Sequence, residues 1–162
     1  YNVPSRTGCN IQPATAVALA KNVKNIVGIK AASGDLSQIA KMMSMADGCL
    51  ELYSGNDDQV LPILSLGGLG VISVLSNVAP KETHDMVMKF LEGDTKGAAE
   101  IQLKAIPLIH ALFSEVNPIP VKAALNLMGK EVGPLRMPLC EMEDANKAKL
   151  AEELKNFGIK LA

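Results

Sequence analysis

The residues Ile26-Val27-Gly28-Ile29-Lys30-Ala31-Ala32-Ser33-Gly34-Asp35 predict a buried strand, a turn and the start of a helix. The run over residues 26–29 is apolar without alternation, which is typical of a strand buried on both faces of a parallel sheet. A turn follows at Ser33-Gly34, and Asp35 is a favourable cap for a helix over residues 36–46. This stretch therefore predicts one unit of a parallel α/β fold.

The same order occurs twice more along the chain. A strand over 49–53 precedes a helix at about 58–66, and a strand over 71–74 precedes a helix that begins after Pro80 and runs to about residue 91. Another helix, over 13–22, comes before the first strand. Strand, loop and helix repeated with short connections indicate a parallel sheet covered by helices.

The remaining chain has a helical pattern of apolar residues. Three further helices are predicted at about 95–114, 119–129 and 144–156. We divide the chain into a partial barrel segment, 1–93, and a C-terminal helical extension, 94–162. Three strand–helix units are too few for a closed (β/α)8 barrel, which needs eight. The chain also opens on Tyr1-Asn2-Val3-Pro4, without Met and as if at the end of a strand, so we expect an N-terminal portion to be missing.

The composition argues against several classes of function. Apolar residues make up 48% of the chain, which is enough for a core. A net charge of −1 and an aromatic content of 3% argue against a nucleic-acid surface, which needs a basic patch. No apolar run approaches the roughly eighteen residues of a membrane span, and no basic-then-apolar leader opens the chain, so we expect a cytoplasmic protein.

No metal site is expected. The cysteines Cys9, Cys49 and Cys140 are odd in number and far apart, so they fit neither a disulfide framework nor a zinc site, and we expect buried or half-buried thiols. His84 and His110 fall inside predicted helices, without a carboxylate or thiol partner at metal-ligand spacing.

Lys30 is the first candidate for chemistry. It lies at the carboxyl end of an apolar strand and is followed by small residues. Apolar surroundings favour the neutral amine, which can attack a keto carbonyl, and parallel α/β folds carry their active sites at the carboxyl ends of their strands. The alternative is a lysine whose ammonium reaches solvent along its aliphatic stem, and position alone favours that alternative.

Two further side chains are expected at the same edge. Tyr1 ends a strand, where its hydroxyl could act as a general acid or base, although in isolation a half-buried structural tyrosine is the better interpretation. Arg6 lies in the loop Pro4-Ser5-Arg6-Thr7-Gly8. Its planar guanidinium could bind a substrate carboxylate or simply face solvent.

Backbone groups complete the candidate site. Gly55 ends the second strand and permits close approach of a ligand, and Asn56 beside it is a candidate for substrate binding. Capping of the next helix is the alternative for Asn56 and the favoured role of Asp57. Ile72 lies in the third strand, where only its backbone could bind polar groups. The run Gly67-Gly68-Leu69-Gly70 follows a helix and enters a strand, so it predicts a tight turn rather than a phosphate loop.

The order of these motifs is similar to that of one known family. The series consists of Tyr1-Asn2-Val3-Pro4-Ser5-Arg6-Thr7-Gly8, Gly28-Ile29-Lys30, Ser54-Gly55-Asn56-Asp57, Gly70-Val71-Ile72-Ser73-Val74 and Asn117-Pro118-Ile119-Pro120-Val121-Lys122. It resembles the dihydrodipicolinate synthase family, of the pyruvate-dependent Schiff-base aldolase superfamily, over the whole chain. The resemblance implies an α/β fold that is the C-terminal part of a TIM (β/α)8 barrel, with three βα units after the end of the fifth strand and three C-terminal helices.

The resemblance also implies roles for single residues. Lys30 would form a Schiff base with pyruvate, without a separate cofactor, and Tyr1 would donate and accept protons. Arg6 would hold the carboxylate of aspartate semialdehyde, and backbone groups of Gly55 and Ile72 would lie near the keto acid. The implied function is condensation of pyruvate with aspartate semialdehyde in lysine and diaminopimelate biosynthesis, by a homo-oligomer.

Some of the family's pattern is not matched in this chain. Ala31 stands where the family usually has an acidic residue. The threonine and second tyrosine of the family's proton relay, and the early-strand groups that bind the pyruvate carboxylate, have no counterpart here. We therefore expect weak or no activity from the chain alone. Two alternatives stay open: a non-catalytic folding or assembly domain, and a pyruvate-releasing sugar-acid lyase of the same superfamily, which the loop containing Arg6 disfavours.

Overall fold

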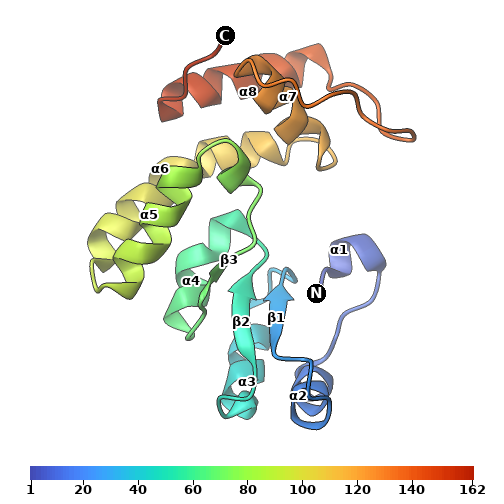
Figure 1. Cartoon of the computed structure of the whole chain (residues 1–162), viewed down its shortest axis with the longest axis vertical. Helices are drawn as coiled ribbons and strands as arrows, with labels where there is room; N and C mark the ends of the chain where they lie inside the picture. The colour runs from blue at the N-terminus through green and yellow to red at the C-terminus, as the bar shows by residue number, and fades with distance from the viewer. The chain divides into compact units, whose positions relative to one another are not determined.

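The computed structural model describes residues 1–162, which form two compact units (Figure 1). The first unit consists of residues 1–73 with 90–93, and the second of residues 74–89 with 94–162. The predicted boundary after residue 93 separates a barrel segment from a helical extension. This is a different division from the two compact units, and it stays a prediction.

A three-stranded parallel sheet forms the centre of the first unit. Its strands are β1 (Gly28–Ala31), β2 (Glu51–Ser54) and β3 (Gly70–Val71), which lie side by side in that order (Figure 1). Each strand is followed by a loop and a helix, so the predicted parallel α/β arrangement is confirmed.

The strands begin and end at other residues than predicted. β1 starts two residues late because the N–H of Ile26 donates to the carbonyl of Val23 at 3.0 Å, which makes Ile26 part of a turn. The second strand lies over 51–54 instead of 49–53. The third was predicted over 71–74 and covers only 70–71, because the chain soon turns into the 3-10 helix η2 (Leu75–Asn77).

The start of the chain extends the sheet beyond β1. Asn2 forms an isolated parallel bridge with Ala31. Its N–H donates to the carbonyl of Lys30 at 3.0 Å, and its carbonyl accepts from the N–H of Ala32 at 2.9 Å. Asn2 therefore lies beside β1 through a single bridge, and the strand predicted to end at residues 1 and 2 stays a prediction. The loop expected after them contains a one-turn helix, α1 (Pro4–Thr7).

Helices cover the sheet of the first unit. α2 (Pro13–Asn22) and α3 (Leu36–Ala46) pack against each other, and the bounds of both were predicted correctly. The N–H of Gln38 donates to the Asp35 side chain at 2.9 Å, which confirms the predicted cap. After β2 come η1 (Asp57–Gln59) and α4 (Val60–Ser65). The buried core of this unit consists of Ala16, Val17, Ile29, Ala31, Ile39, Met42, Ala46, Leu50, Leu52 and Ile63.

The second unit is helical. α6 (Thr95–Leu112) packs against α8 (Asp144–Phe157), and α7 (Ile119–Leu127) contacts both. α5 (Pro80–Leu91) precedes them along the chain. All four helices end within two residues of their predicted bounds. The core shared by α6, α7 and α8 includes Ala105, Leu108, Leu112, Ile119, Ala124, Leu150 and Leu154. None of the helices in the chain combines the length and apolar character needed to cross a membrane.

Candidate active site around Lys30

Tyr1, Lys30 and Tyr53 form one row across the sheet. Asn2 is bridged to Ala31, so Tyr1 lies beside Lys30, and Tyr53 is the register partner of Lys30 on β2. Side chains that are in register on neighbouring parallel strands point to the same face of the sheet. The buried side chain of Ala31 points to the opposite face, into the apolar core. The face with Lys30 therefore gathers one amine and two phenols.

The Lys30 amine lies directly against Tyr1. Its Nζ atom is 4.3 Å from the centroid of the Tyr1 ring, within the range of a cation–π contact. Lys30 is half-buried, and Tyr1 is 64% exposed. The structure thus brings together the two residues for which the sequence predicted chemistry.

Gly55 lies close to the Lys30 side chain. A methyl group added at Gly55 would lie 3.1 Å from Lys30 Cε and only 2.6 Å from Ala32 Cβ. The N–H of Gly55 also donates to the carbonyl of Ala31 at 2.7 Å, which holds the two strand ends together. Only a residue without a side chain fits here, because the Lys30 side chain passes close to Gly55. The approach of a ligand to Gly55 stays a prediction.

The turn after β2 is held by its own hydrogen bonds. The buried Ser54 hydroxyl donates to the carbonyl of Asn56 at 2.8 Å and accepts from the N–H of Asn56 at 3.2 Å. The Asn56 side-chain amide reaches Gln59 Oε1 at 3.5 Å. The capping role favoured for Asp57 is wrong, because the helix begins at Asp57 and the cap position is Asn56, whose side chain makes no capping bond. Substrate binding by Asn56 stays a prediction.

Ile72 offers one backbone group to a ligand. It lies just beyond β3, its side chain is 51% exposed, and its N–H donates to the carbonyl of Ser54 at 2.9 Å. Because the N–H is used within the sheet, only the carbonyl of Ile72 remains for a bound keto acid.

Arg6 lies on α1, directly after the segment that begins with Tyr1. Arg6 is exposed and occupies the last turn of the helix. Gly8 ends α1 in the left-handed region at φ 67°, and its N–H donates to the carbonyl of Pro4 at 2.9 Å. The short helix therefore fixes the backbone from which the guanidinium extends.

Asn2 closes the loop that carries Arg6, and sequence reasoning missed this role. Its side chain is buried, donates to Asn10 Oδ1 at 2.9 Å and accepts from the N–H of Ile11 at 3.0 Å. These two bonds join the ends of the segment that contains α1. Nothing in the local sequence pattern indicates them, because they depend on the packing of residues eight and nine positions away.

Tyr53 was also missed. It is half-buried beside Lys30, and its hydroxyl has no hydrogen-bond partner within the chain. The aromatic ring leans toward Gly70, where an added methyl group would meet ring atoms at 3.8 and 3.9 Å. In the folded chain, Lys30 and Tyr53 both occupy the penultimate position of their strands, and the register between β1 and β2 places them side by side.

The cysteines do not contribute a metal or disulfide centre. Cys49 is half-buried as expected, whereas the prediction is wrong for Cys9 and Cys140, which are exposed in irregular segments. No group of three or more His, Cys, Asp and Glu side chains is gathered in a way that could hold a metal ion.

Comparison with known proteins supports the motif-based resemblance. The model of the Dihydrodipicolinate synthetase family matches residues 1–157. A 4-hydroxy-tetrahydrodipicolinate synthase of Lachnoclostridium phytofermentans is 62% identical over 159 residues, which are 98% of this chain and 54% of that protein. A synthase of the same name from Clostridium tetani is 55% identical over an equal length. The chain spans about half the length of the curated relatives it matches.

Solved structures show the same fold. The dihydrodipicolinate synthase of Thermotoga maritima matches with a TM-score of 0.95 and 44% identity, over 99% of this chain and 55% of that one. The enzyme of Acinetobacter baumannii, solved with pyruvate, matches with a TM-score of 0.93 and 38% identity over the same shares. The prediction that the strands and helices form part of a (β/α)8 barrel, and about half of such a chain, is confirmed.

Proposed function

Because this chain belongs to the dihydrodipicolinate synthetase family, we propose that Lys30 is the residue that binds pyruvate as a Schiff base. Proteins of this family use such a covalent bond and need no separate cofactor. The observation that carries the proposal is the Lys30 amine against the Tyr1 ring, at the carboxyl ends of parallel strands. This edge is where parallel α/β enzymes carry their catalytic groups.

The chemistry begins with the lysine amine. In its neutral form, Lys30 Nζ attacks the keto carbon of pyruvate, and loss of water leaves a protonated imine. Loss of a proton from the methyl group gives an enamine. Its terminal carbon attacks the aldehyde carbon of aspartate semialdehyde and forms a carbon–carbon bond. The amino group of the adduct then attacks the imine carbon, closes the ring and displaces Lys30 as a free amine.

Tyr1 and Arg6 take supporting roles in this proposal. A phenol next to the reacting nitrogen can deliver and remove the protons that imine formation and release require. Arg6 has the planar group that binds a carboxylate through two parallel hydrogen bonds, and aspartate semialdehyde carries such a carboxylate. The carbonyl of Ile72 and the backbone of Gly55 would lie beside the keto acid.

We further propose that the chain alone condenses its substrates weakly or not at all. Tyr1 is 64% exposed, and water around the site weakens every electrostatic contribution to catalysis. The test is the rate of condensation of pyruvate with aspartate semialdehyde by the purified 162-residue chain, compared with a full-length relative. A rate equal to that of the full-length enzyme would contradict this part of the proposal.

A pyruvate-releasing lyase of the same superfamily is the competing activity. The observation against it is Arg6 on the ordered helix α1, directly after the segment that begins with Tyr1. An Arg6→Ala change should raise the KM for aspartate semialdehyde in any condensation that is measurable, while pyruvate binding is kept. Cleavage of a keto sugar acid that is unaffected by Arg6→Ala would favour the lyase. Self-association into homo-oligomers and a cytoplasmic location stay predictions.

A further inference from the structure

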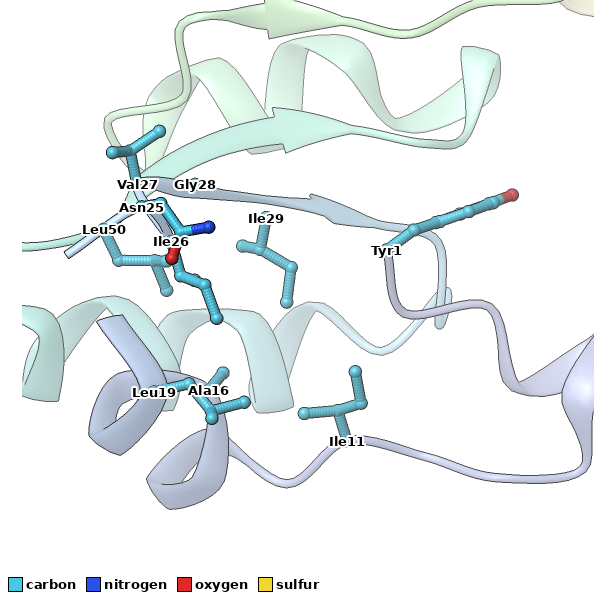
Figure 2. Close-up of a pocket in the computed structure, with 10 residues that line it drawn as sticks. All are labelled: Tyr1, Ile11, Ala16, Leu19, Asn25, Ile26, Val27, Gly28, Ile29 and Leu50. Carbon is cyan, nitrogen blue, oxygen red and sulfur yellow. The ribbon is translucent and has the colours of Figure 1, made fainter. Parts of the chain in front are cut away.

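One cavity of the first unit lies at the open edge of the sheet. It has a volume of about 380 Å³ and lies between β1 and helix α2. Figure 2 shows Ala16 and Leu19 of α2 across from Ile29 of β1, with the Tyr1 ring directed away from these aliphatic side chains. Strands of a closed barrel are paired on both edges, so this space is the place of a further barrel strand and not a ligand site.

A smaller cavity lies entirely within the second unit. Its volume is about 150 Å³, and it lies between α7, the start of α8 and the irregular segment that joins them, 128–143. Lys122 and Asn126 line it from α7, Asp144 and Lys147 from α8, and Glu141 from the joining segment. A cavity of roughly this volume holds a molecule the size of benzene, so the space suits a ligand of about six non-hydrogen atoms.

Hydrogen bonds within the chain hold the walls of this smaller cavity in place. The Lys122 ammonium donates to the carbonyl of Pro134 at 2.7 Å, which ties the joining segment to α7. The Glu115 carboxylate accepts from the N–H of Glu143 at 3.0 Å and from the Asn146 side chain at 2.9 Å, which fixes the start of α8. The cavity therefore has walls that a ligand does not have to order, and this favours binding.

Two cations and two anions line the smaller cavity, and they are not paired with one another. Lys122 and Lys147 supply ammonium groups, and Glu141 and Asp144 supply carboxylates. The ion pairs of the chain lie elsewhere, on α5 and at the turn from α5 to α6. An ion of one sign would meet two like charges here, whereas a molecule with both signs meets an opposite charge at each end.

We propose that this cavity binds an α-amino acid with a small uncharged side chain. The carboxylate of the ligand would lie toward Lys122 and Lys147, and its ammonium group toward Glu141 and Asp144. The two positive and two negative side chains cancel, as do the two charges of a zwitterion. Alanine has the same number of non-hydrogen atoms as benzene, so it matches the volume. None of these residues takes part in the chemistry proposed for Lys30, so this inference does not depend on it.

The test is titration of the isotope-labelled 162-residue chain with L-alanine, followed by NMR of the backbone amides. It is done at pH 7 and low salt, where exposed charges are least screened. Propionate, which lacks the ammonium group of alanine, and ethylamine, which lacks its carboxylate, are the matched probes. We expect saturable shifts around Lys122, Glu141 and Lys147 with a Kd on the order of 1 mM for alanine. Each matched probe loses the attraction of two side chains and should bind roughly tenfold more weakly or worse.

Two pairs of variants locate the site. Lys147→Met removes an ammonium group at an exposed position of α8, and Lys149→Met makes the same change on that helix outside the cavity. We expect Lys147→Met to raise the Kd for alanine roughly fivefold and Lys149→Met to leave it unchanged. Glu141→Gln should weaken alanine binding to a similar extent, and Glu152→Gln, at another exposed position of α8, should not.

Four results would overturn the proposal. They are absence of saturable shifts with alanine in the folded chain, binding of propionate or ethylamine as tight as that of alanine, equal effects of Lys147→Met and Lys149→Met, and shifts that gather around Arg6 instead of Lys122. No pyruvate is present in the experiment, so its outcome is independent of the Schiff-base proposal.

Discussion

The Nζ atom of Lys30 lies 4.3 Å from the centre of the Tyr1 ring, although the two residues are 29 positions apart in the sequence. The contact depends on the parallel bridge between Asn2 and Ala31, which sets the first residue of the chain beside the lysine. An amine and a phenol are thereby held at one edge of the sheet. Gly55 has no side chain, and this leaves space for the aliphatic part of the Lys30 side chain.

Replacing Gly55 by alanine should displace Lys30. The new methyl group would stand 2.6 Å from Ala32 Cβ and 3.1 Å from Lys30 Cε, so we expect a loss of about 1–3 kcal/mol in the free energy of unfolding, typical of overpacking. Urea unfolding measures this. The control is Gly70→Ala, where the added methyl group meets only the Tyr53 ring at ordinary contact distances of 3.8 and 3.9 Å. Equal effects of the two changes would contradict the steric argument.

Replacing Asn2 by alanine should loosen the segment that carries Arg6. The change leaves the N–H of Ile11 and the side chain of Asn10 without their bonds, and loss of a partner for a buried polar group costs about 1–3 kcal/mol. We expect lower stability to urea and faster hydrogen exchange at the Ile11 amide.

Asn22→Ala is the matched control for Asn2→Ala. The Asn22 side chain is exposed and donates only to the Ala18 carbonyl, at 2.7 Å. Its loss should change the free energy of unfolding by no more than about 0.5 kcal/mol. If Asn2→Ala lowered the free energy of unfolding by as little as Asn22→Ala, the side chain of Asn2 would not be the group that stabilises the loop.

Leu108→Ala should destabilise the helical unit strongly. Leu108 is 1% exposed in the core that α6 shares with neighbouring helices, and a buried leucine truncated to alanine typically costs about 2–5 kcal/mol. Leu103 lies on the same helix and is 70% exposed. The free energy of unfolding of Leu103→Ala should stay within about 0.5 kcal/mol of that of the parent. Thermal or urea unfolding followed by circular dichroism distinguishes the two, and similar losses would disprove the assignment of α6's buried face.

The stability of α6 should depend on pH through Asp94. The Lys89 ammonium, 2.6 Å from the Asp94 carboxylate, and the N–H of Gly97 lower the pKa of this carboxyl group. A carboxyl group with a lowered pKa stabilises the folded state above its unfolded pKa of about 4, and the contribution is lost as the pH falls through the lower, folded value. Asp94→Asn keeps the capping geometry but removes the charge.

We therefore expect Asp94→Asn to be less stable than the parent at pH 7 and equal to it at a pH well below the folded pKa. The difference should be modest and should shrink in salt, because the pair is exposed. The urea unfolding midpoints of Asp94→Asn and of the parent, at both pH values, measure this difference in stability. A difference that stays constant across this range would exclude a contribution from the charge of Asp94.

Local sequence predicts the helices better than the strands. The bounds of α2 and α3 follow from Pro13, the Asp35 cap and the apolar pattern, all of which are local signals. The strand ends depend on which backbone groups find partners across the sheet. The N–H of Ile26 bonds within a turn instead, and no feature of the run 26–29 indicates this.

In the candidate site, too, local sequence predicts some residues and not others. Lys30, Tyr1 and Gly55 could be predicted, because the carboxyl ends of neighbouring parallel strands meet at one edge. Tyr53 and Asn2 required the register between strands and the packing of a loop, which only the folded chain supplies. The family's motif order strengthened the prediction of Lys30, for which position alone favoured a structural role.

The most direct test of the central claim is reductive trapping of pyruvate on the 162-residue chain with borohydride. We expect the chain to gain the mass of one reduced pyruvate adduct and peptide mapping to place it on Lys30. A Lys30→Arg variant, which keeps the charge next to Tyr1, should gain none. No adduct on the folded chain, or an adduct spread over surface lysines and unchanged in Lys30→Arg, would contradict the claim that Lys30 is the Schiff-base nucleophile.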